Sequence, residues 1–232
     1  PEPHDGLCTE RVFVMGRLHG VPLAGARPVV AARGLDPAAL ARTLLDCLLR
    51  QIMLGGVFHA DPHPGNVLLL DDGRLGLLDF GSVGRIDAAL QQSLQRLLLG
   101  LDRGDAPAVA DALLEVVDRP DEVDQERLER SLGQFIAQHM GPGAVSTAQM
   151  FVDLFRIVTR YGLSVPPEVA AVFRALATLE GGLDEVAPGF DVVDEARRFA
   201  TVYAAEHFQP DALRQTAADE LAVLLPVPRR LP

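Results

Sequence analysis

The chain contains two polar stretches, HADPHPGN at residues 59–66 and DFG at residues 79–81, that decide its fold. The prolines and the glycine of the first stretch prevent a helix from running through it. Between the two stretches, the apolar runs Val67–Leu70 and Leu75–Leu78 are separated by the letters DDGR, which is the pattern of a β-hairpin and its turn. The sequence therefore predicts a polar loop, a hairpin and a second polar turn in direct succession.

These stretches carry the residue types that phosphoryl transfer needs. Protein kinases use an H-x-D-x-x-x-x-N loop followed by D-F-G, and here Asp61 and Asn66 stand at the required interval. Mg²⁺ prefers oxygen ligands, so the amide of Asn66 and the carboxylate of Asp79 are the predicted metal ligands. Asp61 is the predicted catalytic residue, beside the γ-phosphate, where it would orient a nucleophile or accept its proton. Together Asp61, Asn66 and Asp79 form the predicted site for ATP and Mg²⁺.

The neighbouring residues of the two stretches have further predicted roles. His59 is a second catalytic candidate, although a structural role in holding the loop together is favoured. His63 lies between two prolines and either points into the site or packs on a neighbouring lobe; a zinc site made from both histidines lacks a third ligand. Phe80 is expected to anchor the turn in the apolar interior. Gly81 is expected to supply a backbone conformation that residues with side chains avoid.

Outside the hairpin, apolar periodicity indicates helices nearly everywhere. Asp36 is the predicted N-cap of the first helix, and Gly181-Gly182 is a predicted break. Residues 11–18 suggest a short buried strand, and residues 24–34 an irregular loop. The sequence thus predicts a mainly α fold with a small β-hairpin. The expected helices span residues 36–54, 87–101, 106–117, 124–139, 147–161, 167–180, 192–207 and 210–225.

Composition and charge limit the class of function. With 48% hydrophobic and 23% charged residues, the chain has an ordinary globular composition. The net charge of −11 disfavours nucleic acid as a partner, because phosphate backbones attract clustered cations. The chain has no lysine, so every basic residue is arginine. No apolar run reaches the length of a membrane span, but the final helix, with Arg229-Arg230 after it, has a membrane-surface role as an alternative to packing on the lobe.

The phrase FHADPHPGN at residues 58–66 resembles the UbiB/AarF family of atypical protein-kinase-like proteins. Ala60 and His63 stand where ordinary kinases have Arg and Lys. Glu10–Leu23 is similar to that family's hinge segment between lobes. The phrases RYGL at residues 160–163, PPE at 166–168, RAL at 174–176 and TLEG at 178–181 are similar to its helical C-terminal region.

The resemblance implies a protein-kinase-like C-lobe with extra C-terminal helices, whose N-terminal lobe would lie upstream of this chain. It divides the chain into a hinge and lobe entry at residues 1–23, a lobe with the catalytic and metal-binding loops at 24–118, and a helical extension at 119–232. It also implies that Met15, in the hinge, contacts the nucleotide. An atypical kinase or ATPase, incomplete in this chain, is the expected enzyme.

The same resemblance implies partners and a place in the cell. The expected role is to support isoprenoid quinone biosynthesis or lipid handling, with quinone-biosynthesis proteins or a membrane surface as partners. The expected location is cytoplasmic, with a peripheral position at a membrane as an alternative. Two other functions stay open: a pseudo-kinase scaffold without phosphotransfer, and a choline-kinase-like enzyme that phosphorylates small molecules.

Overall fold

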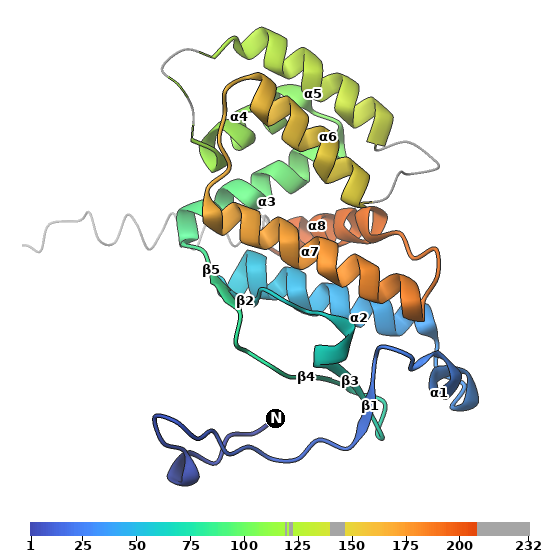
Figure 1. The fold of residues 1–232 in the computed structure, drawn as a ribbon. Coiled ribbons are helices and arrows are strands. Elements are labelled where there is room, and N and C mark those ends of the chain that lie inside the picture. The colour runs from blue at the N-terminus through green and yellow to red at the C-terminus, as the bar shows by residue number, and fades with distance from the viewer. Residues whose placement is uncertain (119, 121–122, 140–146, 208–232) are drawn as a thin grey trace, which may run out of the picture.

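The fold is a body of helices with two small antiparallel sheets at one end (Figure 1). The structure is a computed structural model and describes residues 1–118, 120, 123–139 and 147–207. The predicted fold, mainly α with a small hairpin, is confirmed. The strands are β1 Gly20–Pro22, β2 Val57–His59, β3 Val67–Leu70, β4 Leu75–Leu77 and β5 Val83–Arg85. The helices are α1 Arg27–Ala32, α2 Pro37–Arg50, α3 Ala88–Arg103, α4 Ala106–Val116, α5 Gln125–His139, α6 Thr147–Arg160, α7 Pro167–Val186 and α8 Val192–His207, with shorter helical turns η1 Asp5–Leu7, η2 Gln51–Gly55 and η3 Pro64–Asn66.

The predicted hairpin is formed by β3 and β4, and β1 pairs with the other edge of β3. Gly73 takes φ 84° in the turn, which glycine reaches without steric cost. The second sheet pairs β2 with β5 and sets Phe58 opposite Gly84. A methyl group on Gly84 would lie 2.1 Å from Phe58 Cζ, so only glycine fits there. Strands β1 and β5 were not predicted, because three residues are too few to show a period.

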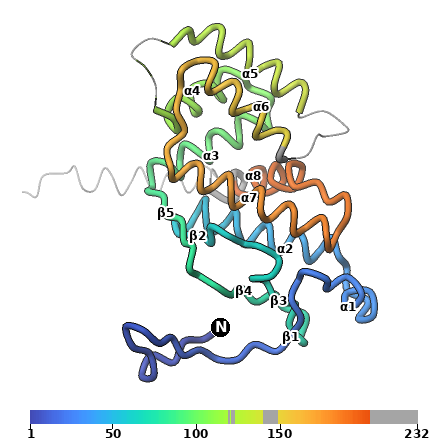
Figure 2. Tube along the Cα trace, viewed as in Figure 1, coloured from blue at the N-terminus to red at the C-terminus, as the bar shows by residue number. Residues whose placement is uncertain are grey.

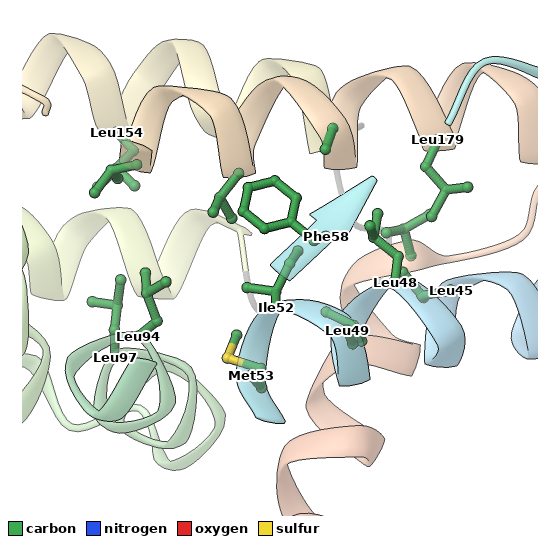
Figure 3. Close-up of a cluster of buried hydrophobic side chains, with 14 of the residues drawn as sticks. Leu45, Leu48, Leu49, Ile52, Met53, Phe58, Leu94, Leu97, Leu154 and Leu179 are labelled. Carbon is green, nitrogen blue, oxygen red and sulfur yellow. The ribbon is translucent and has the colours of Figure 1, made fainter. Parts of the chain in front are cut away.

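Helix α2 and the turn η2 lead into β2 and the polar loop that follows it. The side chain of Asp36 accepts a hydrogen bond from Ala38 N at 2.9 Å, which confirms the predicted N-cap. The helix continues into the π-helical turn η2 and ends at Gly56, whose φ is 67°. Figure 3 shows Phe58 from β2 within a cluster of apolar side chains, with Ile52 beside it. The polar loop after β2 therefore begins from a firmly packed residue.

Two predictions about the first third of the chain are wrong. Residues 11–18 form no strand beyond the isolated bridge between Pro3 and Met15, and Val12 and Phe13 are 54% and 67% exposed. The blue N-terminal segment runs away from the helical body, so it has little apolar surface to pack against (Figure 2). Residues 24–34, expected to be irregular, contain the short helix α1, whose Val30 is buried.

The expected break at Gly181-Gly182 is also wrong, because α7 continues through both glycines to Val186. Leu179, Leu183 and Val186 continue the buried face of this helix and stabilise its last turns. The predicted helix over residues 210–225 and Arg229-Arg230 lie outside the described residues. Within the described part of the chain, no helix is both long enough and apolar enough to cross a membrane.

Candidate active site

His59 is the centre of the hydrogen-bond network at the predicted catalytic loop. Its ring is 2% exposed, its Nδ1 accepts a hydrogen bond from Asp61 N at 3.2 Å, and its Nε2 lies 2.9 Å from Leu78 O. Since Nδ1 accepts, the network assigns the proton to Nε2, which donates to the carbonyl. The backbone N–H of His59 donates to Gln51 Oε1 at 2.9 Å. One buried ring thus joins the catalytic loop to the residue before DFG.

Asn66 ends the loop and joins it to the hairpin. Its N–H donates to His63 O at 2.7 Å, and its carbonyl accepts from Leu78 N at 2.7 Å. Its side-chain Nδ2 donates to Asp61 O at 3.4 Å, a long bond that still fixes which way the amide faces. Because nitrogen is the donor here, the amide oxygen Oδ1 is left for a metal ion. This bond joins Asp61 and Asn66 across the loop.

Asp79 follows Leu78 directly and takes an unusual backbone conformation. Its φ is 54°, the one positive value among the non-glycine residues that the structure describes. Aspartate tolerates this left-handed region better than most residues, and strained backbones gather at functional sites. Its Oδ1 accepts a hydrogen bond from Gly81 N at 3.2 Å. The carboxylates of Asp61 and Asp79 are both exposed to solvent, where a ligand can reach them.

The two other residues of the DFG stretch differ from expectation. Phe80 is 53% exposed and lies outside the interior; its ring centroid is 5.2 Å from that of His59. The interior beneath the loop is already filled by Phe58, which is 1% exposed. The left-handed conformation falls on Asp79 instead of Gly81. In this structure the aspartate itself makes the turn, and Phe80 covers the buried histidine from outside.

His63 is placed by its own turn. Its Nδ1 accepts a hydrogen bond from Gly65 N at 3.1 Å, so the ring caps η3. The side chain is exposed. Both ring nitrogens of His59 are occupied by protein partners. Among the described residues, no three His, Cys, Asp or Glu side chains gather closely enough to hold a metal ion.

The residues present fit Mg²⁺ bound together with a nucleotide. One carboxylate from Asp79 and one amide oxygen from Asn66 are hard ligands, and phosphate oxygens and waters commonly complete the coordination of this ion. Met15, expected to contact the nucleotide, lies 42% exposed on the N-terminal segment, bridged to Pro3. Sequence reasoning missed Gln51, although a glutamine at the end of an apolar helix is a signal that it has a polar partner.

Two protein-family models match this chain. The ABC1 atypical kinase-like domain matches residues 1–113, and the UbiB helical domain matches residues 140–191. An uncharacterized protein of Synechocystis sp., sll0005, is 30% identical over 192 residues, which cover 80% of this chain and 28% of the relative. An Arabidopsis thaliana protein named as an uncharacterized aarF domain-containing protein kinase, chloroplastic, is 27% identical over 222 residues, which cover 85% of this chain and 41% of the relative.

Among solved structures, the complex of Rv3197 with erythromycin from Mycobacterium tuberculosis matches 77% of this chain and 50% of that chain. The TM-score is 0.47 and the sequence identity is 20%. The chain spans less than half of the length of the first two curated relatives, 28% and 46% respectively.

Proposed function

We propose that this chain, which belongs to the ABC1/UbiB family of atypical kinase-like proteins, holds the catalytic and metal-binding loops of an ATP-dependent kinase or ATPase. The observation that carries the proposal is the network around His59. That network ties Asp61 to Leu78, and Leu78 to Asn66, so Asp61, Asn66 and the residue before Asp79 belong to one hydrogen-bonded unit. Preorganised groups of this kind are what phosphoryl transfer requires, because positioning and charge stabilisation supply most of the catalysis.

Each residue of the site has a proposed role. Asn66 and Asp79 would hold Mg²⁺, which would supply positive charge to the phosphates of ATP. Asp61 orients the attacking hydroxyl or water and accepts its proton. His59 is a positioning residue that keeps Asp61 and the DFG turn in register. Met15 contacts the nucleotide from the hinge side.

In this proposal, the activity of the whole protein requires residues that this chain does not contain. The chain contains no lysine, so the lysine that contacts the ATP phosphates in kinases has no equivalent here. We propose that an N-terminal lobe closes over the nucleotide. Membership of the family supports a further proposal: the protein acts in the cytoplasm or at a membrane surface, supporting isoprenoid quinone biosynthesis or lipid handling with the proteins of that process.

A second candidate is a pseudo-kinase scaffold that retains the fold without transferring phosphate. The observation that favours it is the same lack of lysine. Measurements of ATP hydrolysis and of partner binding distinguish the two candidates. Catalysis predicts Mg²⁺-dependent ATP hydrolysis by the whole protein, whereas a scaffold predicts partner binding without ATP turnover. A choline-kinase-like enzyme would instead form a phosphorylated small alcohol.

Asp79→Asn tests the proposed metal ligand with little change to the backbone, since asparagine also accepts a positive φ. We expect ATP hydrolysis by the whole protein to fall at least about 100-fold, because a carboxylate ligand of the metal is lost. For this chain alone, calorimetry should give a Mg·ATP Kd of about 0.1–1 mM, as half a cleft binds weakly.

The matched control is Asp72→Asn, which removes an exposed carboxylate from the hairpin turn outside the site. Its ATP hydrolysis should equal that of the parent protein. Unchanged hydrolysis in Asp79→Asn would rule out the assignment of this residue. Mg·ATP binding by this chain tighter than about 1 μM would contradict the need for a second lobe.

A further inference from the structure

Helix α7 touches the catalytic loop through a glycine. Gly182 is buried on the helix face that meets η3, the turn that contains Asn66. A methyl group on Gly182 would lie 3.0 Å from Pro64 Cδ and 3.2 Å from its Cβ and Cγ. Those separations are shorter than ordinary carbon contacts of about 3.5–4.0 Å. The ring of Pro64 therefore packs against the backbone of α7 so closely that any side-chain carbon at this position would require the ring to shift.

The adjacent Gly181 has no such reason to be glycine. It is exposed, and a methyl group added to it would meet nothing within 4 Å. Glycine inside a helix is destabilising relative to alanine by roughly 0.5–1 kcal/mol. The two neighbouring glycines thus destabilise the helix by the same amount relative to alanine, but they differ in what surrounds them. This contrast separates the contact with Pro64 from any general effect of glycine on α7.

Backbone hydrogen bonds to the segment before α1 also hold the turn that contains Pro64. The carbonyl of Pro64 accepts a hydrogen bond from Ala24 N at 3.2 Å, and Leu23 N donates to Val67 O at 2.7 Å just beyond the turn. The turn η3 is three residues long and ends at Asn66. Asn66 lies two residues after Pro64 in the same turn, and its side chain is bonded to Asp61 O, so a shift of the turn would be carried to both predicted site residues.

We infer that Gly182 is a positioning residue, through which the helical C-terminal region sets the place of the catalytic turn. Its functional consequence rests on the proposed Mg·ATP site, because Asn66 and Asp61 are the groups that the turn carries. In this arrangement, any displacement of α7 along its contact with Pro64 changes the geometry of the metal ligands. The helical region then controls nucleotide binding without touching the nucleotide.

Gly182→Ala and Gly181→Ala test the inference as a matched pair. Asn66 is the only asparagine in the chain, so selective ¹⁵N-asparagine labelling gives one backbone and one side-chain amide signal from the turn itself. Gly182→Ala should shift both signals and weaken Mg·ATP binding about tenfold by calorimetry. Gly181→Ala should leave the signals and the affinity unchanged and raise Tm by about 2–4 °C, from better helix propensity.

Removing the ring that the new methyl group meets should restore the turn. Pro64→Ala deletes Cγ and Cδ, including the nearest atom, so the double variant Gly182→Ala/Pro64→Ala should return the Asn66 signals toward their positions in Pro64→Ala alone. If Gly182→Ala does not fold, recovery of folding in the double variant supports the contact, and failure to recover refutes it.

Two outcomes overturn the inference. In the first, the Asn66 signals of Gly182→Ala match those of Gly181→Ala. In the second, the Asn66 signals of the double variant lie no closer to those of Pro64→Ala than the signals of Gly182→Ala do. Absence of Mg·ATP binding in the parent chain, and of hydrolysis in the whole protein, would instead remove the proposed function. In that case the Asn66 signals still decide whether α7 positions the turn. Loss of the site and loss of the contact are therefore distinguishable.

Discussion

The catalytic segment, residues 59–81, and the helices α4 to α6 are held in place by different forces. In the catalytic segment Asp61 and Asp79 are exposed. Asp61 is bonded through its backbone to His59 and Asn66, and Asp79 follows Leu78, whose backbone is bonded to the same two residues. In α5, Leu128 and Leu132 are fully buried. The exposed polar groups of the first region are fixed by a few specific bonds, whereas α5 is fixed by the area of apolar surface that it removes from water.

This difference follows from what each region must do. A side chain that binds a ligand has to remain exposed, so its own burial cannot fix its position. Buried neighbouring residues must fix it instead. Phe58 and His59 supply those supports from β2, and Pro64 adds a contact with α7. A substitution at one of these supporting residues should therefore change nucleotide binding strongly and stability moderately. A substitution in the core of α4 to α6 should change stability strongly and nucleotide binding little.

The largest expected effect on stability is that of Leu132→Ala in α5. Leu132 is 0% exposed, and truncation of a buried leucine costs about 2–5 kcal/mol because a cavity remains. Denaturant unfolding should show this loss, while Mg·ATP affinity of the folded protein stays that of the parent. Leu7→Ala, at a leucine that is 65% exposed, is the control and should change stability little. A weakened nucleotide affinity in Leu132→Ala would break the contrast between the two regions.

Compared with Leu132→Ala, His59→Ala should reduce stability less and reduce Mg·ATP binding more. The substitution leaves Leu78 O and Asp61 N without their partner, at a cost of about 2 kcal/mol. Mg·ATP binding should weaken at least about tenfold, because both the catalytic loop and the DFG turn lose their common support. The exposed His19 gives the control variant His19→Ala. Normal affinity in His59→Ala would show that the network does not position the site.

The smallest expected effect concerns Ser93 and Glu115, which join α3 to α4. The hydroxyl of Ser93 donates to Glu115 Oε2 at 2.7 Å, and this bond, with a second from Arg96, holds the pKa of the Glu115 carboxyl below its ordinary value. A lowered pKa stabilises the fold above the ordinary pKa, and that stabilisation disappears as pH falls through the lowered value.

Ser93→Ala should therefore reduce stability at pH 7 by less than about 1 kcal/mol, since Glu115 is half exposed and solvent screens the interaction. The difference from the parent protein should shrink as the pH falls through the lowered pKa of Glu115, because the carboxyl is then protonated in both proteins. Denaturant unfolding curves at several pH values measure this difference in the free energy of unfolding. A difference that stays constant across this range would mean that the bond does not act through the charge of Glu115.

Much of the fold and of the site could be predicted because local rules decide those parts. The N-cap at Asp36 and the glycine turn at Gly73 depend on residues next to them in sequence. The hairpin then places Leu78 opposite Asn66, which follows from the register of β3 and β4. Local chemistry was insufficient for Phe80, because whether a phenylalanine is buried depends on which other residue already fills the interior.

The sequence by itself determined the order of helices, the hairpin and the spacing of Asp61, Asn66 and Asp79, since each follows from short-range periodicity or turn chemistry. Only the tertiary structure decided that the N-terminal segment lies exposed, that α7 continues through Gly181 and Gly182, and that Gly182 meets Pro64. Helix propensity disfavours two consecutive glycines in a helix, but burial of the α7 face outweighs that local cost. Contacts between residues more than one hundred positions apart in sequence, such as Pro64 and Gly182, leave no local pattern from which they can be predicted.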